Sequence, residues 1–155
     1  MGSKNKKPKT SNPPRQEMGV TDISKIGKTL VISYKYLDTN NKKYSMNSLS
    51  DSRLRLKYTE DFNEKMKEYC NHEDFKKEIF GRYGDVNRIH RIDWGDNRIR
   101  ENGFTSLDSN LFEQIKYDCW QLRINNETFR VHGFFIENVF YIVWLDPLHN
   151  LYYRK

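Results

Sequence analysis

Arginine, histidine and tyrosine residues gather near the end of the sequence, in a combination that could act on a phosphodiester. The candidate set is Gln121, Arg123, Arg130, His132, His149, Tyr152 and Tyr153. Cleaving RNA without a metal ion requires a base for the ribose 2′-hydroxyl, an acid for the leaving oxygen and fixed positive charge beside the phosphorane. Histidine, tyrosine and arginine can fill these roles. Because an arginine on a strand is often simply solvated, the hypothesis depends on whether these side chains share one surface.

Three short strands between Cys119 and Tyr153 must position this set. β-Branched and aromatic residues alternate there with polar ones, and the breaks fall at Asn125–Asn126 and Glu137–Asn138. Two-residue turns at Glu137–Asn138 and Asn126–Glu127 fix which residues lie opposite each other. The pairs expected on one apolar side are Phe135 with Phe140, Gly133 with Ile142, Val131 with Trp144, Trp120 with Gly133 and Leu122 with Val131. This side is the predicted core.

The opposite side of the same sheet collects the polar residues. Its predicted members are Gln121, Arg123, Arg130, His132 and Tyr141. Arg123 lies directly across from Arg130, and two like charges in that position destabilise a sheet by about 0.2–1 kcal/mol. A bound anion would remove the repulsion.

The rest of the chain is expected to form one domain around this sheet. Its 155 residues suit a single core, and two cysteines without CxxC spacing indicate a reducing compartment. Residues 1–28 carry +5 of the net charge of +6, so the remainder is almost neutral. Rich in lysine and proline, residues 1–28 are predicted to be a disordered basic leader. Residues 29–155 are predicted to form an α+β domain, an antiparallel sheet packed on one face by two or three helices.

Local patterns predict the elements before the last three strands. A strand is expected over Thr29–Leu37, with a turn at Asp38–Asn41, and Tyr44–Leu49 is the expected returning strand. Ser50 and Asp51 should cap a helix, because apolar residues then recur at three- and four-residue steps. Those residues are Leu54, Tyr58, Phe62, Met66 and Tyr69. Four further elements are expected along the chain: a helix over His72–Phe80, an edge strand over Arg88–Trp94, a loop over Gly95–Asn110 and a helical turn over Leu111–Tyr117.

Several function classes lack their usual signals. The four histidines are scattered, and neither HxxxH nor CxxC occurs, so no metal site is expected. The motifs GxGxxG, GxxxxGK and GxSxG are also missing, which disfavours nucleotide-dependent enzymes and serine hydrolases and predicts no cofactor. No apolar run reaches the length of a membrane span, so a cytoplasmic protein without a membrane partner is expected.

The order of elements resembles the RelE/ParE-type toxins of bacterial toxin–antitoxin systems. The likeness covers roughly Leu30–Tyr153 and is carried by WQLR at 120–123, FRV at 129–131, a two-residue hairpin, a hydrophobic last strand and an end with histidine and tyrosine. The resemblance implies cleavage of mRNA in the ribosomal A site and a cognate antitoxin as partner. It implies the following roles: Arg130 as the catalytic arginine, His149 with Tyr152 or Tyr153 in proton transfer, and Arg123 as a phosphate contact.

Two further assignments come from the predicted polar face. His132, two residues from Arg130, is the reserve acid or base, and Gln121 is a substrate-binding candidate. Two other functions remain open from the sequence. One is a non-enzymatic module of a phage or mobile element that binds nucleic acid or protein, and the other is a topoisomerase-binding toxin of the same superfamily. The oligomeric state is also open.

Overall fold

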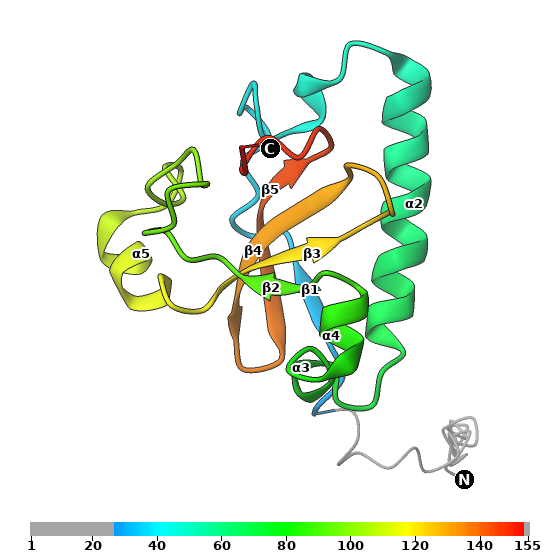
Figure 1. Cartoon of the computed structure of the whole chain (residues 1–155), viewed down its shortest axis with the longest axis vertical. Helices are drawn as coiled ribbons and strands as arrows, with labels where there is room; N and C mark the ends of the chain where they lie inside the picture. Colours follow the sequence, from blue (N-terminus) through cyan, green and yellow to red (C-terminus); the bar gives the residue numbers. More distant parts are fainter. Residues whose placement is uncertain (1–26, 154–155) are drawn as a thin grey trace, which may run out of the picture.

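The computed structural model describes residues 27–153 and is built around a five-stranded mixed sheet (Figure 1). The strands are β1 (Val31–Ser33), β2 (His90–Arg91), β3 (Cys119–Arg123), β4 (Arg130–Ile136) and β5 (Val139–Asp146), in the order β1-β5-β4-β3-β2. The predicted α+β class is confirmed, but β1 pairs with β5 in parallel, so the prediction of an antiparallel sheet is wrong at that edge. All but two residues of the predicted leader lie outside the described residues.

The helices follow the sequence pattern where that pattern was strong. They are α2 (Ser52–Cys70), α3 (Phe75–Glu78), α4 (Arg82–Val86) and α5 (Ser109–Ile115), with a short 3₁₀ helix η1 (Met46–Ser48). As predicted, α2 begins after Asp51, whose carboxylate accepts a hydrogen bond from the Arg53 amide. Of its five predicted apolar residues, Tyr58, Phe62, Met66 and Tyr69 are buried. Leu54 is 43% exposed, so the prediction is wrong for the first turn.

The predicted returning strand over Tyr44–Leu49 is wrong, because this segment contains η1. Side chains here satisfy the backbone locally. The Asn41 side chain accepts the amide hydrogen of Tyr44, and the Ser45 hydroxyl accepts that of Asn47. Such local bonds compete with the ladder of a strand.

The face of the sheet under α2 holds one large apolar cluster, which includes Trp120, Leu122, Val131, Phe135 and Phe140. The register between β3 and β4 is as predicted, with Trp120 opposite Gly133 and Leu122 opposite Val131. The sequence pattern therefore located this core.

The β4–β5 hairpin departs from the predicted register halfway along. Phe135 lies opposite Phe140 and Gly133 opposite Ile142, as expected, but an irregularity between His132 and Gly133 then shifts the pairing. Between Ile142 and Trp144, β5 has one extra residue with no partner in β4. An extra residue of this kind turns the side chains that follow it to the other face. The predicted partner of Val131, Trp144, therefore lies across from His132 instead. Gly133 is required here because a Cβ atom would overlap the carbonyl oxygen of Tyr141.

The second face of the sheet is covered as well, so the helices do not pack on one face alone. Trp144 belongs to a second apolar cluster with Phe104, Ile115 and Phe134. Ile115 comes from α5, which flanks the sheet on the side away from α2 in Figure 1. At the C-terminal end of β5 this face turns polar. Gln121, Arg130, His132 and Asp146 are all at most 2% exposed.

Both cysteines of the chain lie within the described residues. Cys70 and Cys119 are both free thiols. Within residues 27–153, no helix is long and apolar enough to cross a membrane.

Candidate functional site

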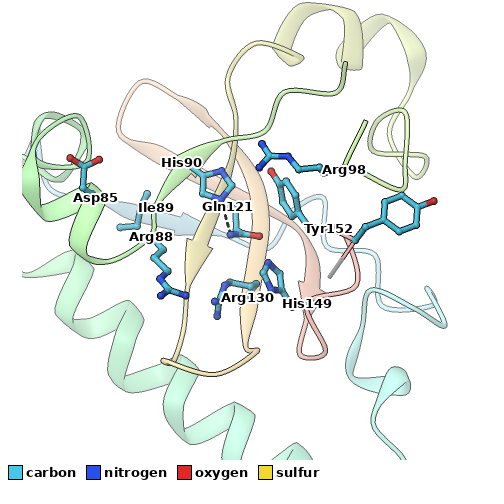
Figure 2. Close-up of a pocket in the computed structure, with 11 residues that line it drawn as sticks. Asp85, Arg88, Ile89, His90, Arg98, Gln121, Arg130, His149 and Tyr152 are labelled. Carbon is cyan, nitrogen blue, oxygen red and sulfur yellow. Dashed lines mark hydrogen bonds between the residues drawn. The ribbon is translucent and has the colours of Figure 1, made fainter. Parts of the chain in front are cut away.

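A pocket of about 920 Å³ opens at the polar end of the second face (Figure 2). Its walls come from α4 and the segment after it, from a loop near residue 98, from β3 and β4, and from the C-terminal segment. The residues that line it are Gly84, Asp85, Arg88, Ile89, His90, Arg98, Gln121, Arg130, His149, Tyr152 and Tyr153. Five of the seven residues predicted from the sequence are therefore brought together here: Gln121, Arg130, His149, Tyr152 and Tyr153.

Arg130 projects from β4 into the base of this pocket with part of its guanidinium unpaired. Its Nη1 donates to the carbonyl oxygens of Phe129 at 2.9 Å and Asn125 at 3.2 Å. Its Nε atom is buried without a hydrogen-bond partner in the described part of the chain. Among residues 27–153, Arg130 makes no ion pair with a carboxylate. A buried cation of this kind is normally compensated, so the position suits an anion.

The electrostatics of Arg130 agree with that assignment. Burial, followed by the positive charges of Arg123 and Arg88, lowers the pKa of Arg130 to about 10. Arg123 pairs with Arg130 across the two strands, as predicted. It does not line the pocket; its Nη2 donates to Asn87 Oδ1 at 3.2 Å. The guanidinium of Arg130 therefore lies in a positive field that a phosphate would relieve.

His132 lies behind the pocket and does not line it. It is fully buried, and its Nε2 lies 3.0 Å from Oδ2 of Asp146, which is also fully buried. A side chain with no exposed surface cannot reach a bound substrate, so the structure gives His132 a supporting place instead of the predicted acid or base position. Tyr141 does not line the pocket either, because its ring stacks on that of Phe134, with ring centroids 5.1 Å apart.

Asp146 fixes the chain segment that carries the C-terminal candidates. Its Oδ1 accepts the amide hydrogen of Asn150 at 2.7 Å, and its Oδ2 accepts that of Leu151 at 3.0 Å. Burial alone would raise the pKa of Asp146, but His132 and these two amides outweigh that effect and lower it. An ionised carboxylate thus anchors the turn that contains His149, whose φ is 55°.

His149 and Tyr152 share the pocket although two residues separate them in the sequence. The centroids of their rings lie 5.9 Å apart. Tyr152 is held by a bridge to Ile99, and the amide of Tyr153 donates to the carbonyl oxygen of Arg98 at 2.8 Å. Burial is the largest cause that raises the pKa of Tyr152, so its hydroxyl keeps its proton at neutral pH.

Sequence reasoning missed four polar residues of the pocket: Asp85, Arg88, His90 and Arg98. Arg88 and His90 are two residues apart in the edge strand predicted over Arg88–Trp94, and this spacing puts both side chains on one face, a signal that could have placed them beside the polar residues. Arg98 comes from a loop and forms an ion pair with Asp96, which no periodic pattern reveals.

His90 extends the row of polar side chains across the sheet. Its Nδ1 lies 3.0 Å from the Arg91 carbonyl oxygen, and its Nε2 lies 2.9 Å from Nε2 of Gln121. The first contact needs a hydrogen on Nδ1, which leaves Nε2 to accept from the Gln121 amide. Although the residue is exposed overall, burial of its ring is the first cause that lowers the pKa of His90, with nearby positive charge also contributing. The ring is therefore neutral at pH 7.

The donor set of this pocket suits an anion better than a cation. Among residues 27–153, no group of three or more histidine, cysteine or acidic residues could hold a metal ion. Comparison with known protein families, with curated protein sequences and with solved structures finds no match for this chain. The likeness to RelE/ParE-type toxins therefore stays a prediction, and the function has to be inferred from the side chains of the pocket.

Proposed function

We propose that the pocket is the active site of a metal-independent endoribonuclease that cleaves single-stranded RNA, including mRNA on the ribosome. The observation that carries this proposal is the convergence of Arg130, His149 and Tyr152 on one cavity, although they come from β4 and from the segment beyond β5. Figure 2 shows them around the same opening, with Gln121 between Arg130 and His90. A positive charge, an imidazole and a protonated phenol can fill the three roles that metal-free cleavage of RNA requires, which are charge stabilisation, a base and an acid.

Arg130 is the group that stabilises the phosphorane in this proposal. Arg130 and Arg88 both line the pocket, so two positive charges lie beside any phosphate bound there. Charge that develops on the phosphate oxygens would be met by donors already in place, so no reorganisation is needed when the bond breaks.

His149 and Tyr152 divide the proton transfers. His149 takes the proton of the ribose 2′-hydroxyl as that oxygen attacks phosphorus. Tyr152, which keeps its own proton at neutral pH, gives it to the 5′-oxygen as the P–O5′ bond breaks, leaving a 2′,3′-cyclic phosphate and a 5′-hydroxyl. The proton taken up by His149 then returns to Tyr152 through solvent. The neutral imidazole of His90, held by Gln121, also lies against Tyr152, with ring centroids 5.5 Å apart.

The wider setting follows the sequence resemblance. The proposal implies a toxin of the RelE/ParE type in a bacterial cytoplasm, encoded with an antitoxin that neutralises it. An antitoxin that blocks this pocket would have to present acidic groups to its arginines.

The test compares rates of RNA cleavage by the intact chain and four variants, with free RNA and with ribosomes carrying mRNA. His149→Gln should lower the rate by about 100- to 10,000-fold, and Arg130→Gln by about 100- to 1,000-fold. Arg53→Gln, on the exposed surface of α2, is the matched control and should cleave normally. Because Arg130 is buried, a low rate in Arg130→Gln has two explanations, loss of the charge and loss of the fold. Arg130→Lys keeps the charge, and thermal melting of each variant shows whether the fold is kept.

Two results would contradict the proposal. RNA that is bound but never cut would identify a non-enzymatic binding module. Cleavage that survives in both His149→Gln and Arg130→Gln would show that the activity lies elsewhere or belongs to a contaminant.

A further inference from the structure

The rim of the pocket carries an exposed aromatic ring that the proposed cleavage chemistry does not use. Tyr153 lines the pocket and is 53% exposed. The guanidinium carbon of Arg100 lies 4.0 Å from the centroid of its ring. One face of the ring is thus covered by a cation, and the exposure leaves surface for a planar ligand on the other.

Backbone hydrogen bonds hold this stacked pair in place. The Arg100 amide donates to the carbonyl oxygen of Leu151 at 2.9 Å, and the Tyr153 amide donates to that of Arg98 at 2.8 Å. Between these two bonds lies the bridge from Ile99 to Tyr152. The backbones of both partners are therefore fixed beside one isolated bridge, and the contact with the Arg100 guanidinium restricts the ring of Tyr153 before a ligand packs against it.

We infer that Tyr153, backed by Arg100, is a stacking platform for a nucleobase of the RNA whose phosphate occupies the pocket. The inference deepens the proposed function and rests on it. A nucleotide presents a flat π surface next to its phosphate, whereas a free phosphate or a phosphorylated side chain does not. Tyr153 would then select single-stranded RNA, because the bases of a duplex are already stacked on each other.

The test measures binding of a short fluorescein-labelled 2′-O-methyl RNA, which has no free 2′-hydroxyl and so cannot be cut. Tyr153→Leu should weaken binding by about 5- to 150-fold, the range for one base–aromatic stack. Tyr153→Phe, which keeps the ring, should bind like the unchanged chain. Tyr117→Leu is the matched control, because Tyr117 is 75% exposed but lies outside this pocket.

Abasic nucleotides in the same RNA probe complete a double-mutant cycle with Tyr153→Leu. An abasic substitution at the stacked position should weaken binding to the unchanged chain, but should not weaken binding to Tyr153→Leu any further. Equal binding by Tyr153→Leu and the unchanged chain, or full additivity at every abasic position, would overturn the inference. Because the probe cannot be cleaved, a chain that stacks the base but never cuts RNA would refute the endoribonuclease proposal alone.

Discussion

The two faces of the sheet are both buried, yet they are built from different residues. The face under α2 is apolar throughout, with Phe135, Phe140 and Ile142 at its centre. The opposite face is apolar only as far as Trp144 and then holds Arg130 with the pair of His132 and Asp146. Buried ionic groups of this kind often stabilise a fold less than apolar residues of similar size would. The difference indicates that the first face maintains the fold and the second maintains the pocket.

The largest effect on stability should come from the apolar face. Phe140 is fully buried against Phe135, with ring centroids 5.0 Å apart. Phe140→Ala should lower the free energy of unfolding by about 3–5 kcal/mol, through lost burial and the cavity it leaves. Urea denaturation followed by fluorescence measures the change. RNA affinity measured well below the transition should stay the same, and a selective loss of affinity would break the division between the two faces.

The anchor under the pocket should matter for both stability and rate. Asp146→Asn removes the charge that holds His132 and one of the two amides of the turn. We expect a loss of about 1.5–3 kcal/mol in unfolding free energy. We also expect a rate of cleavage lower by about 100-fold, because His149 is no longer held in place. Hydrogen exchange at the amides of Asn150 and Leu151 should accelerate in this variant; unchanged protection there would contradict the anchor.

The same carboxylate predicts how stability depends on pH. The folded pKa of Asp146 is lowered from 3.8, so its contribution is fully present above that value and is lost as pH falls through the folded pKa. The difference in unfolding free energy between the unchanged chain and Asp146→Asn should therefore shrink below about pH 4. Urea titrations at a series of acidic pH values measure it. A difference that grows on acidification would mean that the sign of the pKa shift is wrong.

An anion should stabilise the fold through Arg130. At ten times its dissociation constant, inorganic phosphate should raise the unfolding free energy by about 1.4 kcal/mol, because it binds only the folded pocket. Arg130→Gln should lose most of this gain. Scanning calorimetry with phosphate, and with chloride at equal ionic strength, measures the effect. Equal stabilisation of both proteins would mean that phosphate acts elsewhere.

The smallest effect has the opposite sign. Arg123 lies opposite Arg130, and no anion is supplied by the described residues to separate the two charges. Arg123→Gln should raise stability by about 0.2–1 kcal/mol in phosphate-free buffer while weakening RNA binding. Chemical denaturation and anisotropy measure the two changes. A destabilised variant would show that the bond from Arg123 to Asn87 outweighs the repulsion.

The apolar face could be predicted from sequence because its signals are local. Alternation fixed the β3–β4 register, and the spacing from Tyr58 to Tyr69 with the Asp51 cap fixed α2. The prediction failed where the backbone is irregular. The shift beside Gly133 moved Trp144 to the other face, which no two-residue period can anticipate.

The pocket was only partly predictable for a different reason. Arg130, His149 and Tyr152 could be proposed from residue type and chain order. The burial of His132 could not, because it depends on the segment that covers the second face and on Asp146, eight residues beyond the hairpin turn. Arg98 enters from a loop whose path is set by its pairing with the C-terminal segment. Contacts between distant parts of the chain thus complete a site that local patterns only suggest.

The most direct test of the central claim is the chemistry of the cut ends. Single-stranded RNA incubated with the intact chain in EDTA should yield fragments ending in a 2′,3′-cyclic phosphate and a 5′-hydroxyl, as identified by mass spectrometry. A single 2′-deoxy substitution at the cleaved nucleotide should abolish the cut. Intact RNA, or fragments ending in a 3′-hydroxyl, would contradict the proposal that these arginine, histidine and tyrosine side chains form a metal-independent ribonuclease.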